Sequence, residues 1–205
     1  MAQLTIPLDS ARFAKGMTWK DYMAQMGDTR ARTEENYSKA SLTEDERKFF
    51  SGLSQVKHVL MLGENWCGDV HRNSPMIARI VEAMPGAEMR VFLRDQNVDL
   101  TDCFLNNGYR SIPIVVFFDK DWNEIGRWIE RAGTATQKSF AIRAVTLDVA
   151  TEDKKDAAMA EFRKQVQGTY DGPADKSMWR ETAKEVRAVL GAAPGSRRQE
   201  VRGDC

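Results

Sequence analysis

Cysteine and histidine are scarce in this chain of 205 residues, which holds three cysteines and two histidines. The cysteines, Cys67, Cys103 and Cys205, are too few for the disulfide framework of a small secreted domain. A structural zinc site needs four ligands at recognisable spacing, and His58 and His71 do not complete such a set. The sequence therefore predicts neither a disulfide scaffold nor a metal centre, and no cofactor is expected.

The chain also lacks net charge and long apolar runs. Its 30 basic and 30 acidic residues cancel, and such a balance argues against nucleic acid or an anionic membrane as the main partner. No segment approaches the roughly 20 apolar residues of a membrane span. The N-terminus has neither the basic start nor the apolar stretch of a signal peptide. We expect a cytoplasmic protein, and the oligomeric state stays open.

Strands and helices are predicted to alternate through the middle of the chain, whose hydrophobic fraction of 42% can form a core. Apolar or alternating runs predict strands over 56–62, 88–94, 112–118 and 124–129. Helices are predicted over 76–84, 99–105 and 134–147. The first two strands are expected to pair in parallel, because a helix connects them, whereas the short turn between the last two favours an antiparallel pair.

Helical additions are predicted on both sides of this region. Thr18, Thr43 and Thr134 each resemble the start of a capping box, and Asp99 is expected to cap a short helix. Charged amphipathic helices are predicted over 151–167 and 175–190. The length fits one domain with additions or two small ones. We expect a single domain over 1–190 with its core at about 54–150, and a disordered tail over 191–205.

Cys67 lies where an apolar strand meets the start of an amphipathic helix. Its sulfur is therefore expected near the first turn of that helix, where unpaired N–H groups and the positive end of the helix dipole favour a thiolate. An ordinary thiol with a pKa of about 8.5 is only about 3% ionised at pH 7. We interpret Cys67 as a nucleophile; the alternative is a small buried side chain without chemistry.

Two motifs accompany this cysteine: Trp66-Cys67-Gly68-Asp69, followed by Pro75, and Ser111-Ile112-Pro113. Together they resemble the thioredoxin superfamily, and the best match is the branch whose active site reads Trp-Cys-Gly-Asp-Cys. The resemblance implies an α/β fold with a thioredoxin-like central mixed sheet flanked by helices, carrying additional N- and C-terminal helices.

The resemblance also assigns roles to individual residues. Cys67 matches the attacking cysteine, and Pro113 matches the cis-proline beside the active site. The substrate-binding surface is implied to comprise Trp66, Gly68, Asp69 and Ile112. In thioredoxin-like proteins the residue before this proline pairs with the bound peptide, so Ile112 is expected to contribute main-chain contacts.

Two positions depart from that pattern. Val70 stands where the second, resolving cysteine belongs, and Met61 stands where thioredoxins usually carry a buried acid. A dithiol site resolves its mixed disulfide internally, at high effective concentration. An adduct on Cys67 is instead expected to wait for glutathione or another low-molecular-weight thiol as co-substrate. Cys205 on the tail and Cys103 are the alternatives within the chain.

His71 lies four residues after Cys67, so both are expected on one helix face. It is a possible modulator of the thiolate, either as a stabilising cation or as a neutral proton shuttle; the alternative is a solvated helix residue. Asp69 would oppose the thiolate by like charge. Glu64, three residues before the cysteine, is a further candidate base.

Three functions are compatible with these residues. The first is a monothiol thioredoxin-like thiol–disulfide oxidoreductase, whose partner is a disulfide-bearing protein or a small thiol. The second is a redox-inactive thioredoxin-like binding module. The third is a thiol sensor whose Cys67 is oxidised or glutathionylated. The ionisation and reaction rate of Cys67 separate the second from the other two.

Overall fold

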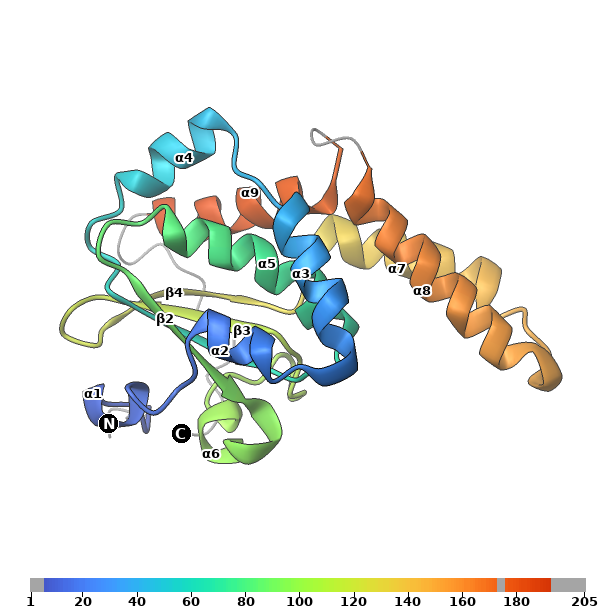
Figure 1. The fold of residues 1–205 in the computed structure, drawn as a ribbon, viewed down its shortest axis with the longest axis horizontal. Coiled ribbons are helices and arrows are strands. Elements are labelled where there is room, and N and C mark those ends of the chain that lie inside the picture. Colours follow the sequence, from blue (N-terminus) through green and yellow to red (C-terminus); the bar gives the residue numbers. More distant parts are fainter. Residues whose placement is uncertain (1–5, 173–175, 193–205) are drawn as a thin grey trace.

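The computed structural model describes residues 6–172 and 176–192, in which a mixed sheet is flanked by helices (Figure 1). Its strands are β1 (His58–Gly63), β2 (Glu88–Leu93), β3 (Ile114–Phe118) and β4 (Glu124–Ile129). Within the described residues they pair in the order β2-β1-β3-β4. Strand β1 is parallel to β2 and antiparallel to β3, and β3 is antiparallel to β4. The expected fold class and strand directions are confirmed.

Helices precede, interrupt and follow this sheet. Before β1 come α1 (Ser10–Phe13), α2 (Trp19–Ala24), η1 (Gly27–Thr29), α3 (Arg30–Lys39) and α4 (Glu44–Ser51). Between the strands come α5 (Gly68–Glu82), η2 (Arg94–Gln96) and α6 (Val98–Asp102). After β4 come α7 (Gly133–Thr146), η3 (Glu152–Lys154), α8 (Lys155–Asp171) and α9 (Met178–Gly191). The expected helical additions are therefore present on both sides, while 193–205 of the expected tail lie outside the described residues.

Local capping signals give mixed results. Thr43 forms the expected capping box with Glu46, and the Thr18 side chain caps α2. The expected caps at Thr134 and Asp99 are wrong, because α7 begins after Ala132 and α6 begins after Asn97. At the start of α7, the Glu185 carboxylate of α9 accepts a hydrogen bond from the backbone N–H of Gly133. The Asp99 carboxylate instead receives two hydrogen bonds from the Arg12 guanidinium.

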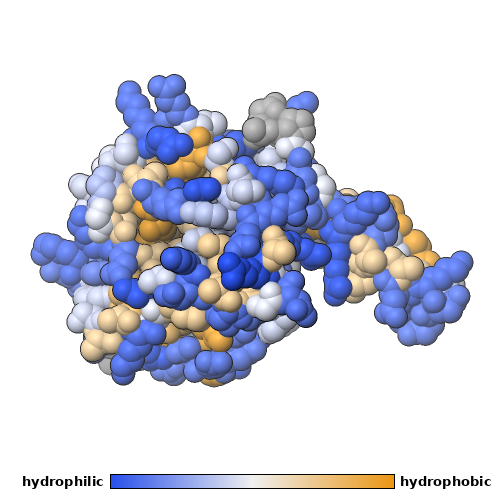
Figure 2. All heavy atoms as spheres, in the orientation of Figure 1, coloured by the Kyte–Doolittle hydropathy of each residue, from blue (hydrophilic) through white to orange (hydrophobic). Residues whose placement is uncertain are grey.

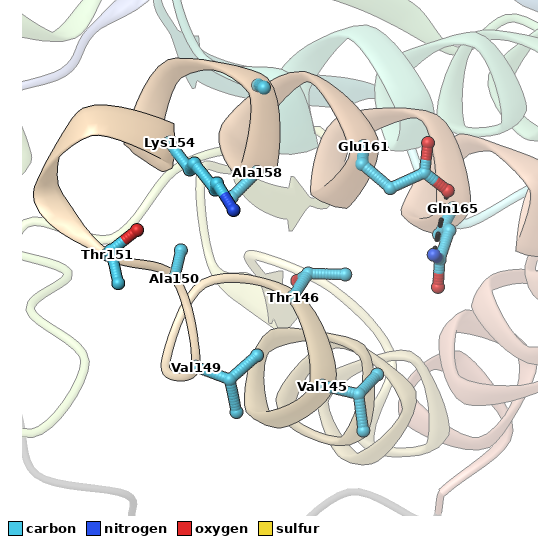
Figure 3. A pocket seen from close by; sticks show the side chains of 10 residues that line it. Val145, Thr146, Val149, Ala150, Thr151, Lys154, Ala158, Glu161 and Gln165 are labelled. Atoms are coloured by element: carbon cyan, nitrogen blue, oxygen red, sulfur yellow. Dashed lines mark hydrogen bonds between the residues drawn. The ribbon is translucent and has the colours of Figure 1, made fainter.

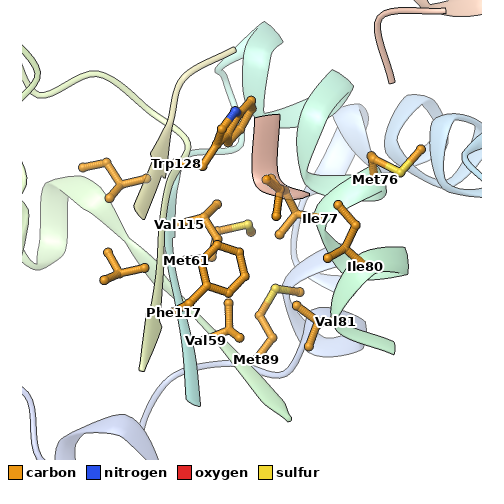
Figure 4. Close-up of a cluster of buried hydrophobic side chains, with 14 of the residues drawn as sticks. Val59, Met61, Met76, Ile77, Ile80, Val81, Met89, Val115, Phe117 and Trp128 are labelled. Carbon is orange, nitrogen blue, oxygen red and sulfur yellow. The ribbon is translucent and has the colours of Figure 1, made fainter. Parts of the chain in front are cut away.

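The core lies between the sheet and α5 (Figure 4). From the sheet it receives Val59, Met61, Met89, Val115, Phe117 and Trp128, and from α5 it receives Met76, Ile77, Ile80 and Val81. Burying one such side chain contributes roughly 1.5–3 kcal/mol. This interface fixes α5 against the sheet, and with it the loop that joins β1 to the first turn of α5.

Helices α9, α7 and α8 lie beyond this core. Trp128 on β4 donates its indole N–H to Glu185 on α9 at 2.9 Å, which ties α9 to the sheet. Helices α7 and α8 pack on each other and project from the body as a two-helix arm (Figures 1 and 2). Phe140, Val145 and Val149 are exposed along α7 and the turn after it. In 6–172 and 176–192, no helix has the length and apolar character needed to span a membrane.

Candidate functional site

Cys67 is the N-cap residue of α5, and its sulfur lies 3.6 Å from the carbonyl oxygen of Ile112. The Ile112–Pro113 peptide bond is cis, immediately before β3. Two motifs that are 45 residues apart in the chain thus meet at one sulfur. Cys67 as a residue is half-buried.

The ionisation of Cys67 differs from the expectation. Burial raises the pKa of the Cys67 thiol above its ordinary value, and this is the largest effect. Backbone N–H groups of Val70 and Asp69, in the first turn of α5, act in the opposite direction, as does the charge of Arg72. The stabilising effect of the helix start is therefore real but smaller than the cost of burying a charge.

Val70, at the position of the second cysteine of a dithiol site, has no access to solvent. Met61, which occupies the position of the usual buried acid, is fully buried as well. A Cβ added to Gly63, at the end of β1, would lie 3.3 Å from Val70 Cγ1. We call the buried apolar residues Val70 and Met61 the inner side of the site, and an adduct on Cys67 has no thiol beside it in the first turn of α5.

A charged cluster, itself largely buried, acts on the sulfur from the first turn of α5; with Trp66 we call it the outer side of the site. The Asp69 carboxylate receives hydrogen bonds from Arg131, which follows β4, and from Arg72 at 3.2 Å. The Arg72 guanidinium covers Gly68, where an added Cβ would lie 2.8 Å from Nη2. A side chain at position 68 would therefore have to displace the guanidinium end of Arg72. Sequence reasoning missed both arginines; the i, i+3 spacing from Asp69 was a signal for Arg72, but nothing local indicated Arg131.

His71 faces α3, which contradicts its expected role as a stabilising cation; its role as a neutral proton shuttle stays a prediction. Its side chain is 3% exposed, and its Nδ1 lies 2.9 Å from the Thr33 hydroxyl. Burial lowers the pKa of His71 to about 4, so the ring is neutral at pH 7. Asn36 on α3 donates a hydrogen bond to the His71 carbonyl at 2.8 Å. His71 therefore links α5 to α3, and the alternative of a solvated helix residue does not hold either.

Trp66 and Glu64, in the loop before Cys67, differ in exposure. Trp66 is 61% exposed, and the Arg94 guanidinium lies over its ring, 4.9 Å from the centroid. Glu64 is buried, and its carboxylate accepts the Asp95 N–H at 2.8 Å. Trp66 is thus available to a partner, whereas the Glu64 carboxylate is turned toward the protein.

Cys103 belongs to another element of the fold. Cys103 caps the end of α6, is buried and is not a free thiol, whereas Cys67 is free. Cys205 lies outside the described residues. In the part of the chain that the structure describes, no three His, Cys, Asp or Glu side chains gather as metal ligands.

A hollow of about 500 Å³ lies elsewhere, between α7, the following turn and α8 (Figure 3). Val145, Thr146 and Val149 line one wall, and Lys154 and Glu161 line the other. None of the residues predicted for the site belongs to it. The hollow is a feature of the arm and not of the sulfur site.

Two solved structures have folds similar to that of this chain. A crystal structure of a protein of unknown function from Pseudomonas aeruginosa aligns over 91% of this chain and 99% of its own, with 17% identity and a TM-score of 0.60. An HIV epitope scaffold aligns over 91% of this chain and 100% of its own, with 16% identity and a TM-score of 0.62. At such identities the likeness concerns the fold alone. No curated protein matches the chain.

A family model described as thioredoxin matches residues 16–145. The match begins just before α2 and extends into α7, so it includes all four strands of the sheet, Cys67 and Pro113. The chain belongs to this thioredoxin family.

Proposed function

We propose that this protein is a monothiol thiol–disulfide oxidoreductase in which Cys67 forms the mixed disulfide and an external thiol resolves it. One observation carries the proposal: the sulfur of the half-buried, free Cys67 lies at the start of α5, 3.6 Å from the Ile112 carbonyl oxygen beside Pro113. A substrate that reaches the sulfur also reaches this main chain. Ile112 would then pair with the substrate, while Trp66, Gly68 and Asp69 would line its path.

The exchange has two steps. Cys67 loses its proton to solvent, and the thiolate attacks one sulfur of a substrate disulfide. A bond forms between Cys67 and that sulfur, the substrate S–S bond breaks, and the second substrate sulfur leaves as a thiolate that takes up a proton. An external thiolate then attacks the mixed disulfide and releases Cys67. The attacked substrate sulfur leaves joined to the external thiol in a new disulfide. A second external thiol cleaves that disulfide, so two external thiol equivalents are oxidised for each substrate disulfide that is fully reduced.

An external thiol is needed because the inner side of the site carries no second thiol. Val70 is apolar and fully buried, so the first turn of α5 holds no second sulfur. Glutathione or another small thiol would act as co-substrate, and the reducing cytoplasm supplies such thiols. No resident cofactor is needed, since the electrons come from the thiol itself.

A redox-inactive binding module is the second candidate, and the pKa of Cys67 favours it. Burial raises that pKa, so less thiolate is present at neutral pH than a helix start alone would give. In this function the surface around Trp66 would hold a peptide without turnover.

A turnover assay separates the two candidates. The protein is mixed with hydroxyethyl disulfide, reduced glutathione, glutathione reductase and NADPH, and NADPH consumption above the protein-free rate is measured. The oxidoreductase proposal predicts protein-dependent consumption that Cys67→Ser abolishes. A rate equal to that of the protein-free mixture overturns the proposal and leaves the binding module.

A further inference from the structure

The Tyr22 hydroxyl is a buried polar group without a hydrogen-bond partner in the described part of the chain. The whole side chain is 0% exposed. A buried donor without a partner destabilises a fold, because it gives up its hydrogen bonds to water and receives none in return. Most buried polar groups in proteins are paired, so an unpaired one requires an explanation.

The hydroxyl lies behind the loop that carries Cys67. Backbone hydrogen bonds of 2.9 and 2.8 Å between Met17 and Val91 hold the chain just before α2 on the edge strand β2. A Cβ added to Gly63 would lie 3.4 Å from the Tyr22 oxygen and 3.3 Å from Val70 Cγ1. Tyr22 therefore places its hydroxyl between the end of β1 and the first turn of α5, next to the residue that replaces the resolving cysteine.

Two acidic groups act on this hydroxyl. Burial raises the pKa of Tyr22, and the negative charges of Glu64 and Cys67 raise it further, so the hydroxyl keeps its proton. Glu64 is itself buried, and its Oε1 already accepts the Asp95 N–H. The Tyr22 hydroxyl thus interacts electrostatically with the Glu64 carboxylate and the Cys67 sulfur, and it donates a hydrogen bond to neither.

We propose that Tyr22 is a positioning residue for Cys67: its hydroxyl proton turns toward the sulfur when the sulfur is ionised and toward Glu64 when it is not. A neutral O–H dipole directed at a negative charge stabilises that charge strongly where water is excluded. Tyr22 gives up no proton in this step; the thiol proton goes to solvent and the hydroxyl only reorients. The inference deepens the proposed function, on which it rests, by assigning a helix of the N-terminal additions to the sulfur site.

Other charged groups also face the sulfur. On α5 these are Asp69 and Arg72, which act on it directly, and Arg131 after β4 binds Asp69. His71 on α5 is neutral at pH 7. The elements packed against α2 are α3 and β2; Arg32 of α3 acts on His71, and Arg90 of β2 is paired with Glu88. These groups stay in place in the variants below, so differences in the pH profile report on Tyr22 and Glu64.

The test is the pH dependence of Cys67 alkylation by iodoacetamide, followed by peptide mass mapping so that only Cys67 is counted. In Tyr22→Phe we expect the midpoint to rise by about one pH unit, which is about tenfold less thiolate at a given pH below the midpoint. In Glu64→Gln, which keeps an oxygen for the Asp95 N–H, we expect the midpoint to fall, because the charge that competes for the Tyr22 proton is gone.

Tyr37→Phe is the matched control. The Tyr37 hydroxyl binds the Glu82 carboxylate at the last turn of α5. That turn lies about 20 Å from Cys67 at 1.5 Å per residue. We expect no change in the Cys67 midpoint, although a hydrogen bond is lost.

Several outcomes overturn the inference. An unchanged or lower midpoint in Tyr22→Phe shows that the hydroxyl has no part in the ionisation of the sulfur. Thermal unfolding checks the variant, which we expect to be at least as stable as the parent because an unpaired hydroxyl is removed. If Tyr22→Phe does not fold, an unchanged midpoint in Glu64→Gln overturns the inference instead. Alkylation requires no turnover, so an inactive protein with shifted midpoints contradicts the proposed function and not the role of Tyr22.

Discussion

The two sides of Cys67 differ in kind. On the outer side lie the exposed ring of Trp66 and the charged cluster of Asp69 with its two arginines. On the inner side, Val70 and Met61 are fully buried and apolar. In a dithiol site the inner side carries the second half of the chemistry. Here the difference means that a reaction partner must come from solvent for both steps of the exchange.

Val70→Cys should have the largest effect, because it removes the chemical difference between the two sides of Cys67. It places a thiol on the inner side, where the mixed disulfide on Cys67 can be resolved at an effective concentration in the millimolar range or above. We expect reduction of insulin by dithiothreitol, measured as turbidity, to be weak in the parent protein and to accelerate about tenfold or more in the variant.

Val70→Ala is the control for that variant, since it opens the same space without adding sulfur, and we expect no gain from it. Equal rates in Val70→Cys and the parent protein would mean that the sulfur site does not have the geometry of a thioredoxin active site.

His71→Gln tests whether the buried His71 ring, which faces α3, is neutral in the folded protein. The pKa of His71 is about 4 in the folded protein and ordinarily 6.5. Between these two pH values His71 is therefore protonated in the unfolded chain and neutral in the folded one. The stability carried by the neutral ring is therefore present above about pH 6.5 and is lost as the pH falls toward 4. The loss amounts to about 2 kcal/mol at pH 5.

Urea unfolding at pH 7.5 and pH 5 measures this loss. We expect His71→Gln to lack about 2 kcal/mol of the pH-dependent drop that the parent protein shows. His58→Gln, at the start of β1, should keep most of the drop. A drop of the same size in His71→Gln and the parent protein would mean that His71 is not buried in its neutral form.

Asp69→Asn tests how the charged cluster on the outer side affects the ionisation of Cys67. The Asp69 charge raises the pKa of Cys67, so its removal should move the alkylation midpoint of Cys67 down by less than about one pH unit. Arg131 loses a charged partner, and we expect a stability loss of about 1–2 kcal/mol.

Asp95→Asn is the matched control, because Asp95 is an exposed acid paired with Arg94 beyond β2. Its midpoint should equal that of the parent protein. An upward shift in Asp69→Asn would contradict the assigned sign of the Asp69 effect.

Trp66→Ala is the smallest expected change in stability, within about 0.5 kcal/mol, because the ring is mostly exposed. Its effect should appear in recognition: reaction of Cys67 with a protein disulfide should slow, while reaction with hydroxyethyl disulfide should not. Stopped samples analysed by mass give both rates. Equal slowing for the two disulfides would assign Trp66 to the thiol itself rather than to the partner surface.

The sequence predicted the framework of the site better than its surroundings. Periodicity located the four strands, because the apolar pattern of a strand is a local property. That Cys67 lies beside the Ile112–Pro113 segment was implied by the resemblance of two short motifs to a known family and not by any local pattern. The surroundings come from distant segments. Thr33 and Tyr22 reach the site from helices before the sheet, and no local pattern shows which side chains of those helices face α5.

The ionisation of the sulfur was misjudged for a related reason. The position of Cys67 at a helix start predicts the favourable N–H groups, which are present, but not the burial that outweighs them. Burial depends on the loop before α5 and on the chain around Ile112, 45 residues away. Similarly, the i, i+4 spacing placed His71 on the face of Cys67, whereas packing against α3 gives the ring its partner.

The most direct measurement is the mass of the intact protein after incubation with oxidised glutathione at pH 8, followed by reduced glutathione. The account predicts one glutathione adduct, mapped to Cys67, which the second step removes and which Cys67→Ser does not form. A parent protein that gains no adduct at Cys67, or whose adduct persists in excess thiol, would contradict a monothiol exchange at this sulfur.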